Sequence, residues 1–175
     1  TINKGDEVIK PAPYWVSYPD IILLAGGKPK IIKCDEKDNF KLTPKKLKKT
    51  ISKKTKWIIL NSPSNPTGSG YTKYEIEELS DILKKYKNTY ILSDDIYEHI
   101  TYDDFKFFTI AQIKQLKDRT LTMNGVSKSY SMTGWRIGYA AGPAEIIKAI
   151  SKIQSQSTSN PSSISQAAAG EALNG

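Results

Sequence analysis

The sequence predicts an α/β fold, a three-layer sandwich in which helices cover both faces of a mostly parallel sheet. One observation is an alternation of short apolar runs with segments whose apolar residues recur at helical spacing. Another is the composition: 175 residues, 38% hydrophobic and 10% aromatic, are enough for one globular unit with a buried core. No internal repeat and no domain boundary is visible within the chain.

Five apolar segments have the length and composition of strands. They are, in chain order, Lys30–Cys34, Trp57–Leu60, Tyr90–Leu92, Thr120–Met123 and Ile137–Ala141. Helical patterns lie between several of them, which is typical of a sheet whose strands run mostly parallel.

Three helices have recognisable starts, and a fourth is indicated by composition. Thr43 precedes Pro44, which suits the first turn of a helix, and Thr72 with Glu75 forms a capping-box pattern. Pro143 opens a third helix, and residues 166–173 have the composition of a fourth. The apolar positions that follow the second and third starts at helical spacing are Ile76, Leu79, Leu83 and Tyr86, then Ile146, Ala149, Ile150 and Ile153.

The positive charge does not predict a nucleic-acid partner. The net charge is +8, but 24 of the 26 basic residues are lysines, and many lie on the polar faces of predicted helices. A protein that binds the phosphate backbone more often uses arginine as well, because the guanidinium group matches phosphate geometry. Only Arg119 and Arg136 are present, so we expect no nucleic acid among the partners.

Three further classes are disfavoured by the sequence. Cys34 is the only cysteine and His99 the only histidine, which leaves no internal disulfide and no metal-ligand set. The longest apolar runs, such as Ile21–Ala25, are too short to span a bilayer, and the N-terminus lacks the apolar region of a signal peptide. We therefore expect a cytoplasmic protein with no membrane partner and no metal.

Lys128 is set apart from the other lysines. It is the only lysine between Lys117 and Lys148, and small, hydroxyl-bearing and aromatic residues surround it in the sequence. An amine becomes a nucleophile when it loses its proton, and burial or a neighbouring cation favours that loss. A surface lysine is the alternative, and the decision depends on the motifs elsewhere in the chain.

Four motifs occur in an order and at separations that resemble the pyridoxal 5'-phosphate (PLP) aminotransferases of fold type I. They are Asn61–Gly68 (NSPSNPTG), Ser93–Glu98 (SDDIYE), Gly125–Lys128 (GVSK) and Gly134–Gly138 (GWRIG). The segment Pro11–Pro19 (PAPYWVSYP) makes the chain most similar to bacterial aspartate aminotransferases, including the aspartate/prephenate kind. The likeness runs from about Gly5 to the C-terminus.

The predicted sheet gives these motifs a common location. Asn65 follows one predicted strand, Asp94 the next, and Lys128 another. In open α/β sheets ligands bind beyond the carboxyl ends of the strands, so the three polar segments are expected to meet at one edge. Taken singly, each has an ordinary alternative: Asn65–Gly68 as a turn, Asp94 and Ser127 as caps.

The resemblance implies a role for each residue of the cofactor site. Lys128 would bond covalently to PLP and move a proton as general base and acid. Asp94 would hold the proton on the ring nitrogen, because an opposite charge favours the cationic form. Tyr97 and Asn65 would bond to the phenolic oxygen of the ring, and Asn65 would also help to hold the substrate carboxylate. Asp95 is the rival carboxylate, but adjacent side chains of an extended segment point to opposite faces.

The remaining contacts follow from the same resemblance. Trp15 would stack on the ring and line the substrate site, with a packed core position as its alternative. Arg136 and Ser127 would bind the phosphate, since the guanidinium fork suits that group.

Two departures from the family pattern bear on the site. Many members have a serine three residues before the lysine, where this chain has Gly125. Members are also more than twice as long, so residues 1–175 resemble the central part of the large PLP-binding domain. The N-terminal arm, the C-terminal small domain and a tyrosine from the partner subunit would lie outside this chain.

The function implied is transamination between L-aspartate, or a similar amino acid, and a 2-oxo acid such as 2-oxoglutarate, in a homodimer. Prephenate, aromatic or alanine aminotransferase activity is the nearest alternative. A second alternative is an inactive fragment that acts only as a folded or assembling module.

Overall fold

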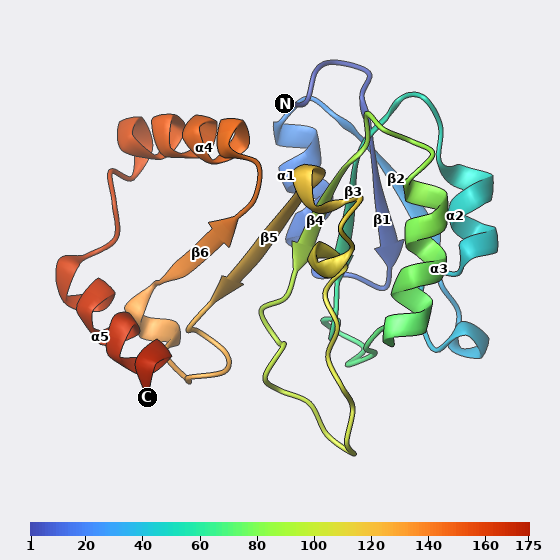
Figure 1. The fold of residues 1–175 in the computed structure, drawn as a ribbon. Helices are drawn as coiled ribbons and strands as arrows, with labels where there is room; N and C mark the ends of the chain where they lie inside the picture. Colours follow the sequence, from blue (N-terminus) through green and yellow to red (C-terminus); the bar gives the residue numbers. More distant parts are fainter.

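The computed structural model describes residues 1–175 and contains one six-stranded sheet with strand order β2-β1-β3-β4-β5-β6 (Figure 1). The first five strands are parallel, and β6 runs antiparallel to β5. The prediction of an α/β fold with a mostly parallel sheet is therefore confirmed. The strands are β1 (Glu7–Ala12), β2 (Lys28–Lys33), β3 (Thr55–Asn61), β4 (Tyr90–Asp94), β5 (Thr120–Gly125) and β6 (Gly138–Ala141).

Five α-helices accompany the sheet, and the predicted caps are present. The Thr43 side chain accepts a hydrogen bond from the Lys46 backbone N–H, and Thr72 forms a reciprocal capping box with Glu75. The helices are α1 (Ser17–Leu24), α2 (Pro44–Thr50), α3 (Lys73–Leu83), α4 (Ala144–Ser157) and α5 (Ser163–Asn174). Short 3-10 helices occupy Glu36–Asp38, Ile110–Gln112, Lys117–Arg119 and Thr133–Trp135. No helix is long and apolar enough to cross a bilayer.

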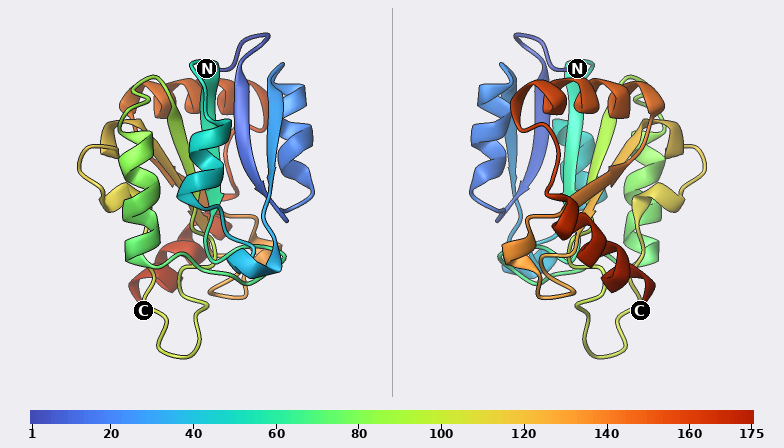
Figure 2. Two further views of the ribbon diagram at one scale, coloured as in Figure 1. Left: turned by 90° about the vertical axis from the view of Figure 1, so that its right-hand side faces the viewer. Right: turned by 90° about the vertical axis from the view of Figure 1, so that its left-hand side faces the viewer.

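Apolar side chains cover both faces of the sheet, which gives the three layers that the sequence predicts. On one face α2 and α3 bury Leu47, Leu79 and Leu83 against the strands (Figure 2). On the other face α1 and α4 bury Tyr18 and Ile146. Burying each such side chain stabilises the fold by about 1.5–3 kcal/mol. The strand residues in the first cluster include Ile9, Ile58 and Ile91, and those in the second include Val8, Ile59 and Leu121.

Two elements, β1 and α1, form without a clear local signal in the sequence. In β1, Lys10 and Pro11 interrupt the apolar run, yet both positions pair with β2. Helix α1 starts after Val16, which provides no side-chain cap, and it contains Pro19 near its start. Tertiary packing of Tyr18 and Ile22 against the sheet stabilises α1 in place of local signals.

The strand order directs several loops to one edge. After β1 the chain moves outward to β2, and it then returns to build β3, β4 and β5 on the other side of β1. Such a reversal opens a crevice beyond the carboxyl ends of the strands. The segments that follow β1, β3, β4 and β5 therefore meet at that edge.

Candidate active site

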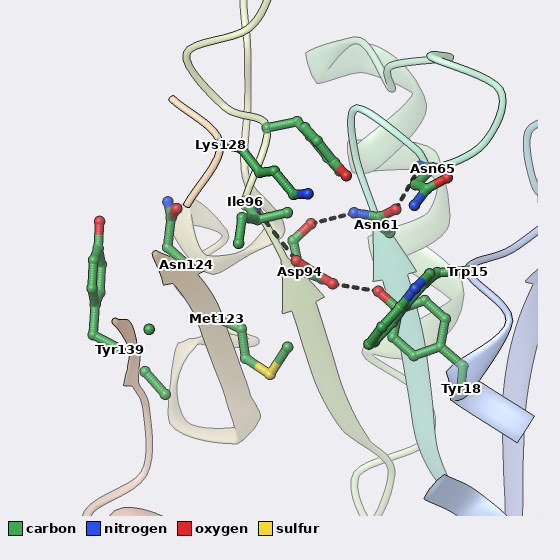
Figure 3. Close-up of a pocket in the computed structure, with 13 residues that line it drawn as sticks. Trp15, Tyr18, Asn61, Asn65, Asp94, Ile96, Met123, Asn124, Lys128 and Tyr139 are labelled. Carbon is green, nitrogen blue, oxygen red and sulfur yellow. Dashed lines mark hydrogen bonds between the residues drawn. The ribbon is translucent and has the colours of Figure 1, made fainter. Parts of the chain in front are cut away.

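A cavity of about 470 Å³ lies beyond the carboxyl ends of β3, β4 and β5 (Figure 3). Apolar and polar groups share its wall, as is usual for a small-molecule site. The lining residues are Trp15, Tyr18, Asn61, Asn65, Asp94, Ile96, Tyr97, Met123, Asn124, Lys128, Gly138, Tyr139 and Ala140.

Five of the seven residues singled out from the sequence line this cavity. Asp94 is the last residue of β4, and Tyr97 lies in the turn that follows it. Trp15 follows β1, Asn65 follows β3 and Lys128 follows β5. Segments up to 113 residues apart in the sequence thus come together through the strand order.

The other two, Ser127 and Arg136, do not line the cavity. Arg136 is exposed and adopts a left-handed backbone conformation with a φ of 56°. Its guanidinium donates a hydrogen bond to the Thr133 carbonyl at 3.0 Å, within its own turn. The Ser127 carbonyl accepts a bond from the Thr133 hydroxyl at 3.1 Å, so Thr133 links the two segments.

Three hydrogen bonds hold Asp94, two on its carboxylate and one on its backbone carbonyl. The Tyr18 hydroxyl donates to one carboxylate oxygen, and the Ile96 N–H lies 3.4 Å from the other. The Asn61 amide donates to the Asp94 carbonyl at 2.9 Å (Figure 3). Burial and the neighbouring Asp94 raise the pKa of Tyr18, so the phenol keeps its proton and acts as the donor. These bonds fix the carboxylate, and Asp94 is a buried residue with 7% of its surface exposed.

Asp95 points to the opposite face of the sheet. Its carboxylate accepts a hydrogen bond from the Ser93 hydroxyl at 2.7 Å and does not reach the cavity. Burial raises the pKa of Asp95 to about 6. The two adjacent carboxyl groups therefore have separate environments, and only Asp94 faces the cavity.

Sequence reasoning missed Tyr18 and Asn61. Tyr18 reaches Asp94 across 76 positions of sequence and makes an edge-to-face contact with Trp15, with 5.5 Å between the ring centroids. The Asn61 side-chain oxygen accepts a hydrogen bond from the Asn65 N–H at 2.8 Å, which fixes the loop after β3. The only indication in the sequence that these two residues belong to the site is that each lies within four positions of a predicted site residue.

Gly125 is required by the close pairing of β5 and β6. A Cβ atom at this position would lie 2.8 Å from the Ile137 carbonyl oxygen, a distance that real Cβ atoms essentially never show. A serine therefore does not fit here without a shift of the backbone of β6.

The cavity offers a defined set of chemical groups. Trp15 supplies a flat aromatic surface, Asp94 a buried carboxylate and Lys128 an exposed amine that points into the cavity (Figure 3). Asn65 and Tyr97 add an amide and a phenol. Such a set suits a planar ligand with a basic ring nitrogen, a polar oxygen and a carbon that reacts with amines.

Comparisons with known proteins indicate one family over the whole chain. The sequence model of the family "Aminotransferase class I and II" matches residues 1–175. The chain is 62% identical to a protein named probable aspartate/prephenate aminotransferase from Rickettsia typhi, and 61% identical to the aspartate/prephenate aminotransferase of Cereibacter sphaeroides. In both cases all of this chain and 44% of the other protein are covered, so the chain spans less than half the length of these relatives.

The solved structures that resemble this chain are also aminotransferases. The aspartate aminotransferase of Rhizobium meliloti superposes with a TM-score of 0.97 at 55% identity, over 100% of this chain and 44% of that one. An aromatic aminotransferase from Pyrococcus horikoshii superposes with a TM-score of 0.96 at 40% identity, over 100% of this chain and 47% of that one.

Proposed function

Because this chain belongs to the class I and II aminotransferases, we propose that residues 1–175 form the central part of a PLP-binding domain that transfers amino groups. The substrates we propose are L-aspartate, or a similar amino acid, and 2-oxoglutarate, handled by a homodimer. The observation that carries the proposal is the convergence of Lys128, Asp94, Tyr97, Asn65 and Trp15 on one cavity.

The donor set of the cavity fits PLP. Trp15 would face the ring, and Asp94 would receive the ring nitrogen. Tyr97 and Asn65 would bond to the phenolic oxygen, and Lys128 would carry the cofactor.

The segment after β5 fits the phosphate group of PLP. The Ser129 hydroxyl is buried without a hydrogen-bond partner, so it is free to donate to an anion. Ser127 lies in the same segment, and Arg136 is exposed nearby in the sequence. For Arg136 to reach a phosphate, the guanidinium would exchange its bond to the Thr133 carbonyl for one to the anion.

When bound, PLP withdraws electrons from the bonds at the amino acid α-carbon. Asp94 supports that withdrawal by holding a proton on the ring nitrogen, which its shielded and hydrogen-bonded carboxylate is suited to do. Lys128 would act as the general base and acid that removes the α-proton of the substrate and delivers it to the C4′ carbon of the cofactor. Asn65, with its backbone fixed by Asn61, orients the substrate carboxylate.

A second candidate substrate class is aromatic, including prephenate. The curated relatives carry the name aspartate/prephenate aminotransferase, and a structural relative is named an aromatic aminotransferase. The wall of the cavity near Met123, Tyr139 and Ala140 is apolar enough to contact a six-membered ring.

The test uses a chimera in which residues 1–175 replace the matching segment of the Rhizobium meliloti aspartate aminotransferase, called here the Rhizobium chimera. We expect the Rhizobium chimera to bind PLP and to transaminate aspartate with 2-oxoglutarate, with prephenate and phenylalanine assayed beside it. The 175-residue protein alone spans 44% of its relative from Rickettsia typhi, and it should hold PLP weakly and turn over aspartate negligibly, because part of the phosphate cradle and the groups that anchor the substrate carboxylates would lie outside it. A folded, dimeric chimera without PLP binding would contradict the proposal.

A further inference from the structure

Lys10 is a buried lysine in the middle of β1. Its side chain is 2% exposed and lies on the face of the sheet that α1 covers. The Nζ atom makes one long hydrogen bond, 3.5 Å to the Ile59 carbonyl oxygen, and lies 4.2 Å from the ring centroid of Tyr18. A buried ammonium group with so few partners is costly, so its presence points to a use beyond packing.

The charge of Lys10 persists at neutral pH. Burial lowers its pKa to about 8, and Asp94 together with Cys34 opposes that decrease. The ammonium form therefore predominates at pH 7. Of these two, Asp94 has the larger influence, and it is also the residue to which the Tyr18 hydroxyl donates.

Tyr18 connects Lys10 to the cavity. The ammonium lies over the face of the Tyr18 ring, and the hydroxyl of the same ring donates to Asp94. A cation on the ring face draws electron density from the phenol and strengthens its O–H as a donor to a carboxylate. Tyr18 and Asp94 line the cavity whereas Lys10 does not, so Lys10 acts on a ligand only through these two side chains.

We propose that Lys10 is a positioning residue: its buried ammonium holds the Tyr18 ring in place as the donor to Asp94, and so fixes the orientation of the carboxylate that would face the ring nitrogen of PLP. This inference rests on the proposed function. It predicts that Lys10 matters for ligands with a ring nitrogen and not for ligands of the same shape that lack one.

The test compares PLP with its 1-deaza analogue, in which a carbon replaces the ring nitrogen. Dissociation constants of both ligands are measured for the Lys10→Met variant, in the Rhizobium chimera and in the 175-residue protein. Methionine fills a similar volume without charge, so the fold is retained. We expect the affinity for PLP to fall about tenfold and the affinity for the deaza analogue to stay the same or rise.

Two further variants make the comparison specific. Lys56 also lies over an aromatic ring, 5.4 Å from the centroid of Tyr90, but neither residue lines the cavity. Lys56→Met should therefore leave both dissociation constants unchanged. In a double-mutant cycle, Lys10→Met should have a smaller effect on PLP affinity in a Tyr18→Phe background, because Tyr18 transmits the effect.

The outcomes separate the inference from the proposed function. Equal losses of affinity for both ligands, or no loss for either, would overturn the role of Lys10 and leave the proposed function intact. Absence of PLP binding in the unmodified Rhizobium chimera would overturn both.

Discussion

Replacement of Asp94 by asparagine removes one negative charge with little change of shape. Asparagine still accepts a hydrogen bond from the Tyr18 hydroxyl, and the Asn61 bond goes to the backbone carbonyl, so the fold of the loop is preserved. The change therefore isolates the charge from the packing. Asp94 is 7% exposed, so solvent does little to screen this charge.

The expected loss follows from the energy of one ion pair. Two unit charges about 4 Å apart interact by about 4 kcal/mol at an effective dielectric constant of about 20. Since each ~1.4 kcal/mol corresponds to a tenfold change in rate, the amino-transfer step should slow about a thousandfold. The assay is the single-turnover reaction of the PLP-loaded Rhizobium chimera with aspartate, followed by stopped-flow absorbance.

Asp95→Asn is the matched control. Asp95 is adjacent in sequence and also buried, but its carboxylate binds Ser93 on the opposite face of the sheet. Its replacement should change the rate less than tenfold. If Asp95→Asn slows the reaction a thousandfold and Asp94→Asn does not, the assignment of the ring carboxylate is wrong by one position.

Three further predictions concern single residues. Because the folded pKa of Asp95, about 6, exceeds its usual value of 3.8, its proton stabilises the fold at low pH and this contribution is lost as pH rises from about 4 to 6. The free energy of unfolding, measured by chemical denaturation, should decline by about 2–3 kcal/mol over this pH range in the parent protein and should not decline in Asp95→Asn. Gly125→Ser should lower the free energy of unfolding by about 1–3 kcal/mol, because its Cβ would meet the Ile137 carbonyl; a variant of unchanged stability would contradict that clash. Lys128→Ala in the Rhizobium chimera should keep PLP binding by dialysis but lose transamination, and turnover within tenfold of the parent would exclude Lys128 as the proton carrier.

The parts of the fold that were predictable depend on short-range signals. The capping box of α3 joins Thr72 to Glu75 within one turn, so the sequence alone identifies it. The first strand was missed because the burial of Lys10 depends on Tyr18 and Asp94, which are distant in sequence. Helix α1 was missed for a related reason, since it lacks a capping side chain and is stabilised by tertiary packing.

The site, like the fold, was predictable where sequence signals are local and not where the contact joins distant residues. The motifs predicted which side chains lie together around Asp94 and Lys128, because the strands of a parallel sheet bring their carboxyl ends to one edge. They did not reveal the bond from Tyr18 to Asp94, which requires knowledge of how α1 packs. Arg136 bonds within its own turn, a local arrangement that its sequence neighbourhood does not distinguish from phosphate binding. The catalytic roles themselves stay predictions.

Reduction with borohydride tests the central claim most directly, because it fixes PLP to whichever lysine carries it. The Rhizobium chimera is incubated with PLP, reduced and digested, and the labelled peptide is identified by mass spectrometry. We expect the label on Lys128, the one lysine that lines the cavity. Label on the buried Lys10, or on Lys117 or Lys148, would contradict the assignment of the active site.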